Sequence, residues 1–315
     1  MLPALPPQLP LFVWHEYPPG RTPRYIELNL RLARRLAPPY FAVHVVGNDS
    51  IGRWAGDGLP DEFWSLPYAA ARADVARTLL LMRHGGLWID ADVLVARPLG
   101  AVRRLLEAHE FVSYAIRGQS CAEGAFSANF VAARPGSAFW RRAWDAERAL
   151  LRQRCRVGGA LRPRCDRLPW GSTGMGVWHA IGKRMAGAGD LDFACFSGGE
   201  SLAPDVPGAR LSVFQVPATP LCPPGGVERA TAACCERDAR DLVCRGRRNH
   251  TGRSEAFFDR LAYHLFESMW GAARYEAMPQ IERVDADGAP LVASLLYAEA
   301  RVAYPEAFEG VSVLV

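Results

Sequence analysis

The stretch from Tyr68 to Leu99 reads YAAARADVARTLLLMRHGGLWIDADVLVARPL. Its first half has apolar residues at helical spacing, and Gly85-Gly86 ends that pattern. An apolar strand, Leu87–Ile89, follows and reaches Asp90-Ala91-Asp92 before running on through residues 93–95. Two carboxylates at a strand end are costly to bury without a cationic partner. A divalent metal carrying a diphosphate would be such a partner.

The composition limits the class of protein. The chain has 315 residues, half of them apolar, which allows a large core and disfavours disorder. Its net charge of +4 comes from 37 basic and 33 acidic side chains, and this balance gives no indication of nucleic-acid binding. No apolar run is long enough to predict a transmembrane segment. The Pro-rich start lacks a basic region and is not typical of a signal peptide.

The eight cysteines leave the compartment open. Four of them fall between Cys222 and Cys244, within a Gly-, Pro- and charge-rich stretch. They either form disulfides that cross-link a loop in an oxidising lumen, such as the Golgi, or remain thiols in a reducing cytosol or at a membrane periphery. The sequon Asn249-His250-Thr251 fits the lumen. Zinc is disfavoured, because no paired CxxC spacing occurs.

The order of elements predicts an α/β protein. Strands at Leu11–Trp14 and Phe41–Val46 flank a helix at Pro23–Leu36, and this β-α-β start predicts a mainly parallel sheet with helices on both faces. We expect one domain over residues 1–315. Its nucleotide-binding part covers about 8–135, and its acceptor-side, closing part covers about 136–315 with a Cys-rich loop at about 222–253. Segment 257–269 is expected to be helical or mixed.

Four polar side chains are candidates for the chemistry. Asp90 and Asp92 are two residues apart, so on a fraying strand end both can reach one ion. Asp74 and Arg77 share a helix face at i, i+3 spacing, and the Gly85-Gly86 turn would bring them to the same ligand. Taken singly, the first pair fits a solvated turn and the second fits a surface ion pair.

The combined spacing resembles a known family. The pattern D-hydrophobic-x-R, then GG-hydrophobic-aromatic-hydrophobic-D-x-D, resembles the DxD signature of glycosyltransferase family 32, its capsular polysaccharide synthesis relatives and the glucosyltransferase domains of large clostridial toxins. It is filled here by Asp74, Arg77, Gly85, Gly86, Trp88, Asp90 and Asp92.

This resemblance implies a GT-A fold, a nucleotide-sugar donor and Mn²⁺ or Mg²⁺, with retention of anomeric configuration. It implies that Asp92 ligates the metal directly and that Asp90 holds the ribose or a metal-bound water. It further implies that Asp74 accepts from sugar hydroxyls and that Arg77 contacts the sugar and phosphate side. The acceptor would be a glycan, polysaccharide or glycolipid.

Weaker similarities extend the resemblance. Trp14 would cover the base, and Asn129 would lie near the donor sugar. The segment 263–270 resembles a closing H-x-W-x-x-S-W segment, which implies that Ser268 and Trp270 close over the diphosphate with His264 nearby. Thr173-Gly174-Met175-Gly176 resembles a T-G-P-G segment. Each of these residues has an ordinary packing role as its alternative.

Other function classes stay in view. A degenerate, non-catalytic glycan-binding protein is one alternative. The second DxD, Asp285-Ala286-Asp287, is similar to the first motif of haloacid-dehalogenase-type phosphatases, but only 27 residues follow Gly288, too few for their core. Nucleotidyltransferases are disfavoured, because no GxGxxG or P-loop occurs.

Overall fold

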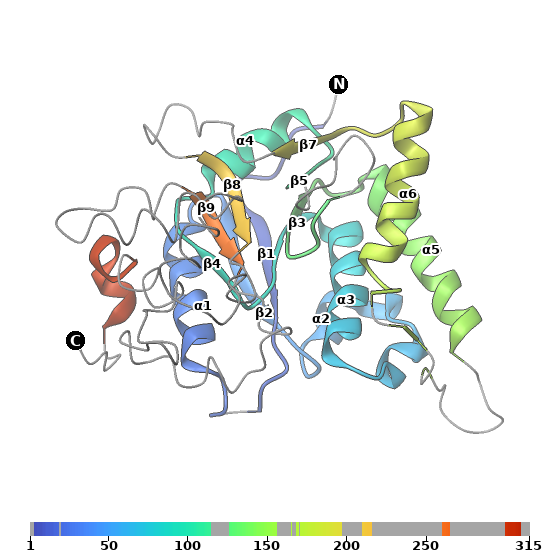
Figure 1. The fold of residues 1–315 in the computed structure, drawn as a ribbon, viewed down its shortest axis with the longest axis horizontal. Helices are drawn as coiled ribbons and strands as arrows, with labels where there is room; N and C mark the ends of the chain where they lie inside the picture. The colour runs from blue at the N-terminus through green and yellow to red at the C-terminus, as the bar shows by residue number, and fades with distance from the viewer. Residues whose placement is uncertain are drawn as a thin grey trace, which may run out of the picture. The chain divides into compact units, whose positions relative to one another are not determined.

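A computed structural model describes residues 3–18, 20–114, 126–155, 165, 168–169, 171–196, 210–215, 260–264 and 300–309 (Figure 1). Backbone contacts divide the chain into two compact units. The first unit contains Met1–Glu16, Ala37–Asp90 and Leu99–Ser197. The second contains Tyr17–Leu36, Ala91–Pro98 and Gly198–Val315. The expected single domain, with parts meeting near residue 135, stays a prediction.

The first unit is built on a six-stranded sheet of order β2-β1-β3-β6-β5-β7. Strand β1 is parallel to both β2 and β3, and β5 is parallel to β7, whereas β6 is antiparallel to its two neighbours. The mainly parallel sheet is therefore confirmed. The strands are β1 Leu9–Trp14, β2 Phe41–Val46, β3 Gly86–Ile89, β5 Phe111–Tyr114, β6 Phe130–Ala133 and β7 Phe193–Phe196.

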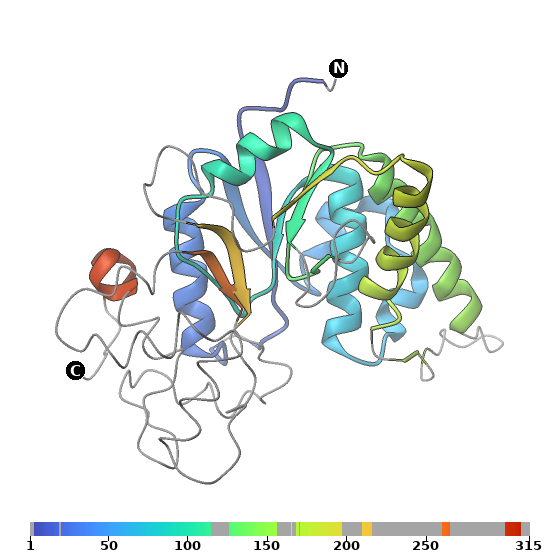
Figure 2. The same ribbon diagram turned by 45° about the horizontal axis from the view of Figure 1, so that its top comes forward.

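Helices cover both faces of this sheet. Helix α3 (Ala69–His84) packs on β1, β3 and β6, then α5 (Ala138–Arg154) packs on α3, and α6 (Met175–Ala188) packs on α5. Helix α4 (Gly100–Ala108) contacts β5 and β6 from the other side (Figure 2). The short α2 (Ile51–Ala55) leads toward α3. Buried aromatic rings fill the layer between sheet and helices, among them Trp88, Trp140, Trp178, Phe12 and Phe111.

The turn between α3 and β3 accepts only glycine. Gly85 ends α3 at φ +63°, and a Cβ there would lie 2.4 Å from the Pro135 nitrogen. Gly86 has φ +96°, and its Cβ would lie 2.1 Å from the Pro10 carbonyl oxygen. A side chain at either position would collide with backbone that cannot move aside. The predicted glycine hinge is confirmed, and it joins the helix directly to the strand.

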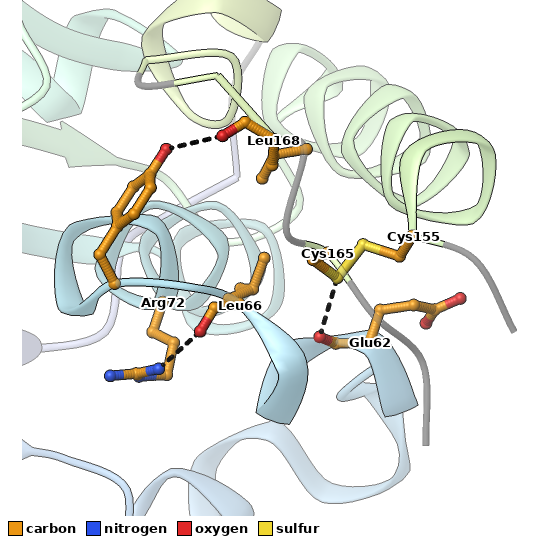
Figure 3. The surroundings of a disulfide bond; sticks show 7 residues. Glu62, Leu66, Arg72, Cys155, Cys165 and Leu168 are labelled. Atoms are coloured by element: carbon orange, nitrogen blue, oxygen red, sulfur yellow. Dashed lines mark hydrogen bonds between the residues drawn. A yellow bond between two sulfur atoms is a disulfide. The ribbon is translucent and has the colours of Figure 1, made fainter. Parts of the chain in front are cut away.

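A disulfide joins Cys155, just after α5, to Cys165 (Figure 3). The Cys165 sulfur lies 3.7 Å from the carbonyl oxygen of Glu62. Cys195, on β7, is disulfide-bonded as well. The cysteines at 222–244, the sequon and the second DxD lie outside the described residues.

The second unit contains helix α1 (Arg24–Leu36) and a three-stranded sheet of order β4-β9-β8. Its strands are β4 Val93–Val95, β8 Arg210–Gln215 and β9 Arg260–His264. The short helix η4 (Pro305–Phe308) follows Tyr304, whose hydroxyl donates to the Ala96 carbonyl at 2.9 Å.

One local expectation was wrong. The expected strand through residues 87–95 is divided, because a turn at Ala91-Asp92 sends β3 and β4 into different sheets. Asn29 of α1 supports that turn by donating to the Ala91 carbonyl at 3.0 Å. The described part of segment 257–269, which was expected to be helical or mixed, is strand β9. In the described parts of the chain, no helix has the length and apolarity that a membrane crossing requires.

Candidate active site

The candidate site lies at the carboxyl edge of the parallel strands in the first unit. Because β1 and β3 are parallel neighbours, Trp14, the last residue of β1, and Asp90, which follows β3, lie at the same edge of the sheet. Arg72 of α3 donates two bonds to Glu16, at 2.6 and 2.7 Å, so the first turns of α3 face this edge too. Ligands of open α/β sheets gather at such an edge.

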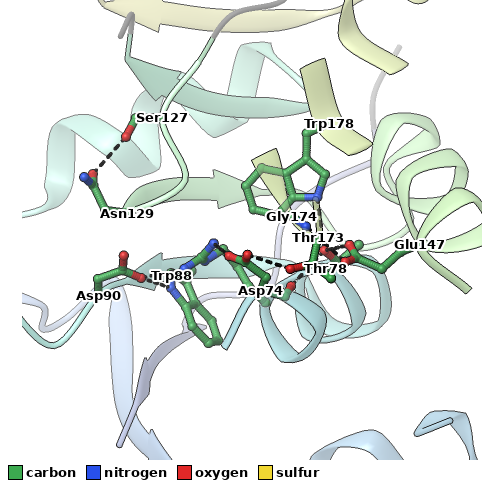
Figure 4. Close-up of polar contacts among 11 residues, drawn as sticks. Asp74, Thr78, Trp88, Asp90, Ser127, Asn129, Glu147, Thr173, Gly174 and Trp178 are labelled. Atoms are coloured by element: carbon green, nitrogen blue, oxygen red, sulfur yellow. Dashed lines mark hydrogen bonds and ion pairs between the residues drawn. The ribbon is translucent and has the colours of Figure 1, made fainter. Parts of the chain in front are cut away.

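Arg77 bridges two carboxylates at the centre of this site. Figure 4 labels these carboxylates, Asp74 and Asp90. Its Nη1 donates to Asp74 Oδ1 and its Nη2 to Asp90 Oδ1, both at 2.7 Å. The side chain is only 3% exposed. Its guanidinium carbon lies 4.9 Å from the Trp88 ring centre and 5.4 Å from that of Trp178. The structure thus brings Asp74, Arg77, Trp88 and Asp90 together.

Burial and charge oppose each other in this group. Burial by itself would lower the pKa of Arg77, but the charges of Asp90 and Asp74 outweigh it and raise that pKa. Burial raises the pKa of Asp74, although Arg77 and the hydroxyl of Thr173 act against this shift. The guanidinium therefore stays charged and holds two carboxylates that would otherwise repel each other.

Asp90 has one occupied and one available oxygen. Its Oδ1 accepts from Arg77 and also from Trp88 Nε1 at 2.7 Å. Its Oδ2 has no hydrogen-bond partner among the described residues, and the side chain is 29% exposed. The Asp90 amide donates to the Asn129 carbonyl at 2.9 Å, which brings Asn129 to the same strand end. Asp90 Oδ2 is thus the oxygen that can receive a ligand.

Two further predicted residues, Trp14 and Asn129, are held by hydrogen bonds within the first unit. Trp14 is 7% exposed, and its Nε1 donates to Glu16 at 3.0 Å. The Asn129 side-chain oxygen accepts from Tyr114 at 2.6 Å and from Ser127 at 3.1 Å. Both side chains are therefore held in place by the first unit.

Four other predicted positions belong to the second unit or lie outside the described residues. Asp92 is 8% exposed and belongs to the second unit, as does His264, which ends β9 in register with Val93. Ser268 and Trp270 lie outside the described residues. No group of three or more His, Cys, Asp or Glu side chains suited to a metal occurs in the described part of the chain.

The sequence interpretation missed Glu147 and the residues around it. Glu147 of α5 is 0% exposed, accepts from the Gly174 amide at 3.0 Å and lies 2.8 Å from Thr78 Oγ1. Thr173 Oγ1 donates to Asp74 Oδ2 at 3.0 Å. One signal was available: Glu147 falls among the buried apolar positions of its helix, between Trp144 and Leu151.

Burial raises the pKa of Glu147 to about 7, and the nearby Asp74 charge adds to that rise. Bonds from Gly174 and Thr78, together with the Arg77 charge, act in the opposite direction. A carboxyl group this deep therefore takes up a proton far more readily than an exposed one.

Residues 42–112 match the family model described as the glycosyltransferase sugar-binding region containing the DXD motif. This chain carries a DXD-type glycosyltransferase region. The matched residues include Asp74, Arg77, Trp88, Asp90 and Asp92. This match confirms the glycosyltransferase assignment predicted from the sequence. The mixed, mostly parallel sheet agrees with the expected α/β fold class.

Solved structures give distant matches to this glycosyltransferase. The PaToxG glycosyltransferase is 11% identical over 56% of this chain and 69% of its own, with a TM-score of 0.41. The galactosyltransferase LgtC, solved with donor and acceptor sugar analogues, is 12% identical over 85% and 94%, with a TM-score of 0.39. GlyE of Streptococcus pneumoniae TIGR4 is 9% identical over 60% and 45%, with a TM-score of 0.36. No curated protein matches the chain.

Proposed function

We propose that this glycosyltransferase is metal-dependent and moves a sugar from a UDP- or GDP-sugar to a glycan, polysaccharide or glycolipid acceptor. The observation that carries the proposal is the Arg77 bridge, which holds Asp74 and Asp90 together at the carboxyl edge of the sheet. The family match over the same residues supports a sugar-bearing ligand.

The carboxylates of this site have separate roles. Asp74 accepts hydrogen bonds from hydroxyls of the donor sugar, while Arg77 keeps it beside Asp90 and acts on the sugar and phosphate side. Trp88 orients Asp90 through its indole N–H. Trp14 covers the nucleotide base, and Asn129 lies near the donor sugar. His264, Ser268 and Trp270 belong to the segment that closes over the diphosphate.

Asp90 and Asp92 are the residues that would hold Mn²⁺ or Mg²⁺. The donor set fits such an ion, because Asp90 offers a carboxylate oxygen with no partner in the described residues. Asp74 and Asp90 also carry two negative charges against the single positive charge of Arg77, so the site favours a cation. Mn²⁺ and Mg²⁺ are hard cations that prefer oxygen ligands. A few protein carboxylates together with phosphate oxygens of the donor can complete the coordination of such an ion. When bound, the ion offsets the charge that grows on the leaving nucleoside diphosphate.

We also propose that the reaction retains the anomeric configuration, on the support of the resemblance to family 32. Anomer-resolved NMR of the product of an acceptor reaction tests this point. An inverted product would contradict it and leave the donor assignment unaffected.

A ligand panel tests the proposed function. The protein is heated with UDP-, GDP- and CMP-sugars, each with and without Mn²⁺. A ligand at about 100 times its Kd stabilises a protein by about 2.7 kcal/mol, so a binding donor raises Tm by several degrees. Donors that raise Tm are then tested for hydrolysis by release of free sugar. We expect a UDP- or GDP-sugar to bind and to be hydrolysed only with the metal.

Two outcomes would contradict the proposal. If no nucleotide sugar raises Tm with metal present, the donor assignment is wrong, and the alternative of a non-catalytic glycan-binding protein is favoured. If a donor is hydrolysed equally well in EDTA, the metal dependence is wrong.

A further inference from the structure

Glu147 is a fully buried carboxyl group that has no part in the proposed reaction. It lies on α5, whose other buried residues are apolar: Phe139, Trp140, Ala143, Trp144 and Leu151. An acidic group in such surroundings lowers stability unless its oxygens are hydrogen-bonded. Its hydrogen-bond partners come from α3, which carries Asp74, and from the turn before α6, which donates to Asp74.

One oxygen of Glu147 fixes the turn before α6. Its Oε1 accepts from the Gly174 amide at 3.0 Å. The preceding residue, Thr173, donates to Asp74 Oδ2 at 3.0 Å. The turn also packs directly on Asp74, because a Cβ at Gly174 would lie 2.6 Å from Asp74 Cγ. A shift of this turn would therefore move both the donor and the packing surface of Asp74.

The other oxygen fixes the helix that carries Asp74. Glu147 Oε2 lies 2.8 Å from Thr78 Oγ1, and Thr78 follows Asp74 by one helical turn. Thr78 Oγ1 also lies 3.0 Å from the Asp74 carbonyl oxygen and accepts from Trp178 Nε1 at 3.1 Å. Trp178 in turn stacks on Arg77. This single hydroxyl thus joins α3, α5 and α6.

The hydroxyl proton of Thr78 links these contacts to the protonation of Glu147. Thr78 has one proton and two acceptors within reach, the Asp74 carbonyl and Glu147 Oε2. Both contacts are hydrogen bonds at once when Glu147 is protonated and donates to Thr78. The charged groups that act on Glu147 are Asp74 and Arg77 of α3, and α6 faces it with the Gly174 amide. Glu147 keeps its contact with Thr78 whether its carboxyl group is charged or protonated, so α3 and α5 stay joined in both forms.

We propose that Glu147 is a positioning residue for Asp74: from α5 it fixes both the helix that carries Asp74 and the turn that donates to it. The inference rests on the proposed function, in which Asp74 binds the donor sugar.

The test compares Glu147→Ala and Glu147→Gln with the same changes at Glu110. Glu110 is a matched control, because it accepts from Ser137 and from the Ala138 amide at the start of α5 and lies outside the Asp74 group. With the donor that the wild type hydrolyses, Glu147→Ala should lower kcat between about 10- and 100-fold, as expected when a substrate-binding group is misplaced. Its affinity for the nucleoside diphosphate alone should stay at the wild-type value. Glu147→Gln, which can make both bonds, should recover most of the lost turnover.

Two results would overturn the inference. One is a loss of kcat in Glu147→Ala no greater than in Glu110→Ala. The other is an equal loss of turnover and nucleotide affinity, which indicates general damage to the fold.

A second measurement separates this inference from the proposed function. The free energy of unfolding is measured for Glu147→Gln, Asp74→Asn and the double variant. We expect the two changes to be non-additive, because Thr78, Thr173 and Gly174 connect the two side chains. This coupling is present even if no nucleotide sugar is hydrolysed, in which case the proposed function fails and the inference stands only as a structural coupling. Strict additivity would overturn the inference by itself.

Discussion

Arg77 Nη2 lies 2.7 Å from Asp90 Oδ1, and this bond joins the middle of α3 to the end of β3. The same guanidinium donates to Asp74, one turn earlier on the helix. Because Arg77 is buried between Trp88 and Trp178, little water competes for these bonds. The three polar side chains therefore act as one group, and removal of its cation leaves two carboxylates uncompensated.

Arg77→Met should lower the free energy of unfolding by about 3–5 kcal/mol, the usual effect of removing one partner from a buried ion pair. Arg77→Lys should lower it less, because an ammonium keeps the charge but cannot span both carboxylates as a planar fork does. Urea unfolding measures both changes. Arg148→Met, an exposed arginine on α5, is the control. Equal stability of Arg77→Met and wild type would contradict the bridging role.

Asp92→Asn should reduce metal-dependent donor hydrolysis by about 10²-fold or more, as for loss of an electrostatic stabiliser of the leaving group. The fold should persist, because asparagine has nearly the shape of aspartate. Hydrolysis is measured over a Mn²⁺ titration, and EDTA should remove the wild-type activity. Asp285→Asn in the second DxD is the control, and a loss of activity there would show that the metal has been assigned to the wrong aspartates.

Gly174→Ala should be more damaging than Gly189→Ala. Both glycines have positive φ, +55° and +73°, so alanine strains the backbone by about 1–3 kcal/mol at either site. Only at Gly174 would the new Cβ meet another side chain, Asp74, whereas nothing lies within 4 Å at Gly189. Thermal unfolding and donor hydrolysis are compared. Turnover that falls equally in both variants would speak against the tight packing of this turn on Asp74.

The stability of Glu147→Gln relative to the wild type should increase with pH. In the wild type the pKa of Glu147 is near 4.5 unfolded and about 7 folded. The folded protein thus keeps a proton that the unfolded chain releases, so the free energy of unfolding falls as pH rises from about 4.5 to 7. A shift of this size corresponds to about 3 kcal/mol, and glutamine lacks it. Urea unfolding of both proteins at pH 5 and pH 8 measures the difference in their free energies of unfolding. This difference should favour Glu147→Gln more at pH 8 than at pH 5, and an equal difference at both pH values would contradict the prediction.

Replacement of both Cys155 and Cys165 by serine should lower the free energy of unfolding by about 3 kcal/mol, the value expected when a cross-link closing a loop of this length is lost. Denaturant unfolding without reductant measures it. Treatment of the wild type with dithiothreitol, which also reduces the disulfide of Cys195, should produce a loss at least as large. A double variant as stable as the oxidised wild type would indicate that this cross-link adds nothing to stability.

The local part of the site was predictable from the sequence. Asp74, Arg77, Gly85, Gly86, Trp88 and Asp90 lie within one helix, one turn and one strand. Helical spacing predicted Asp74 beside Arg77, and the glycine pair predicted that both face the ligand of the aspartates. The ion pair between Arg77 and Asp90 was not predicted. The mainly parallel sheet followed in the same way from the alternation of strands and helices.

The tertiary structure decided the rest. Glu147 reaches Thr78 across 69 residues, and Thr173 reaches Asp74 across 99. Such contacts leave no periodic trace, because they depend on how α5 and α6 pack on α3. Packing also divided the expected strand at Ala91-Asp92, since β3 and β4 hydrogen-bond to different sheets. Sequence by itself thus determined that Asp74, Arg77 and Asp90 belong to one site, whereas the bond from Arg77 to Asp90 was seen only in the folded chain. Only the three-helix packing determined that a buried glutamate and a threonine turn hold Asp74 in place, because burial and non-local hydrogen bonds exist only in the folded chain.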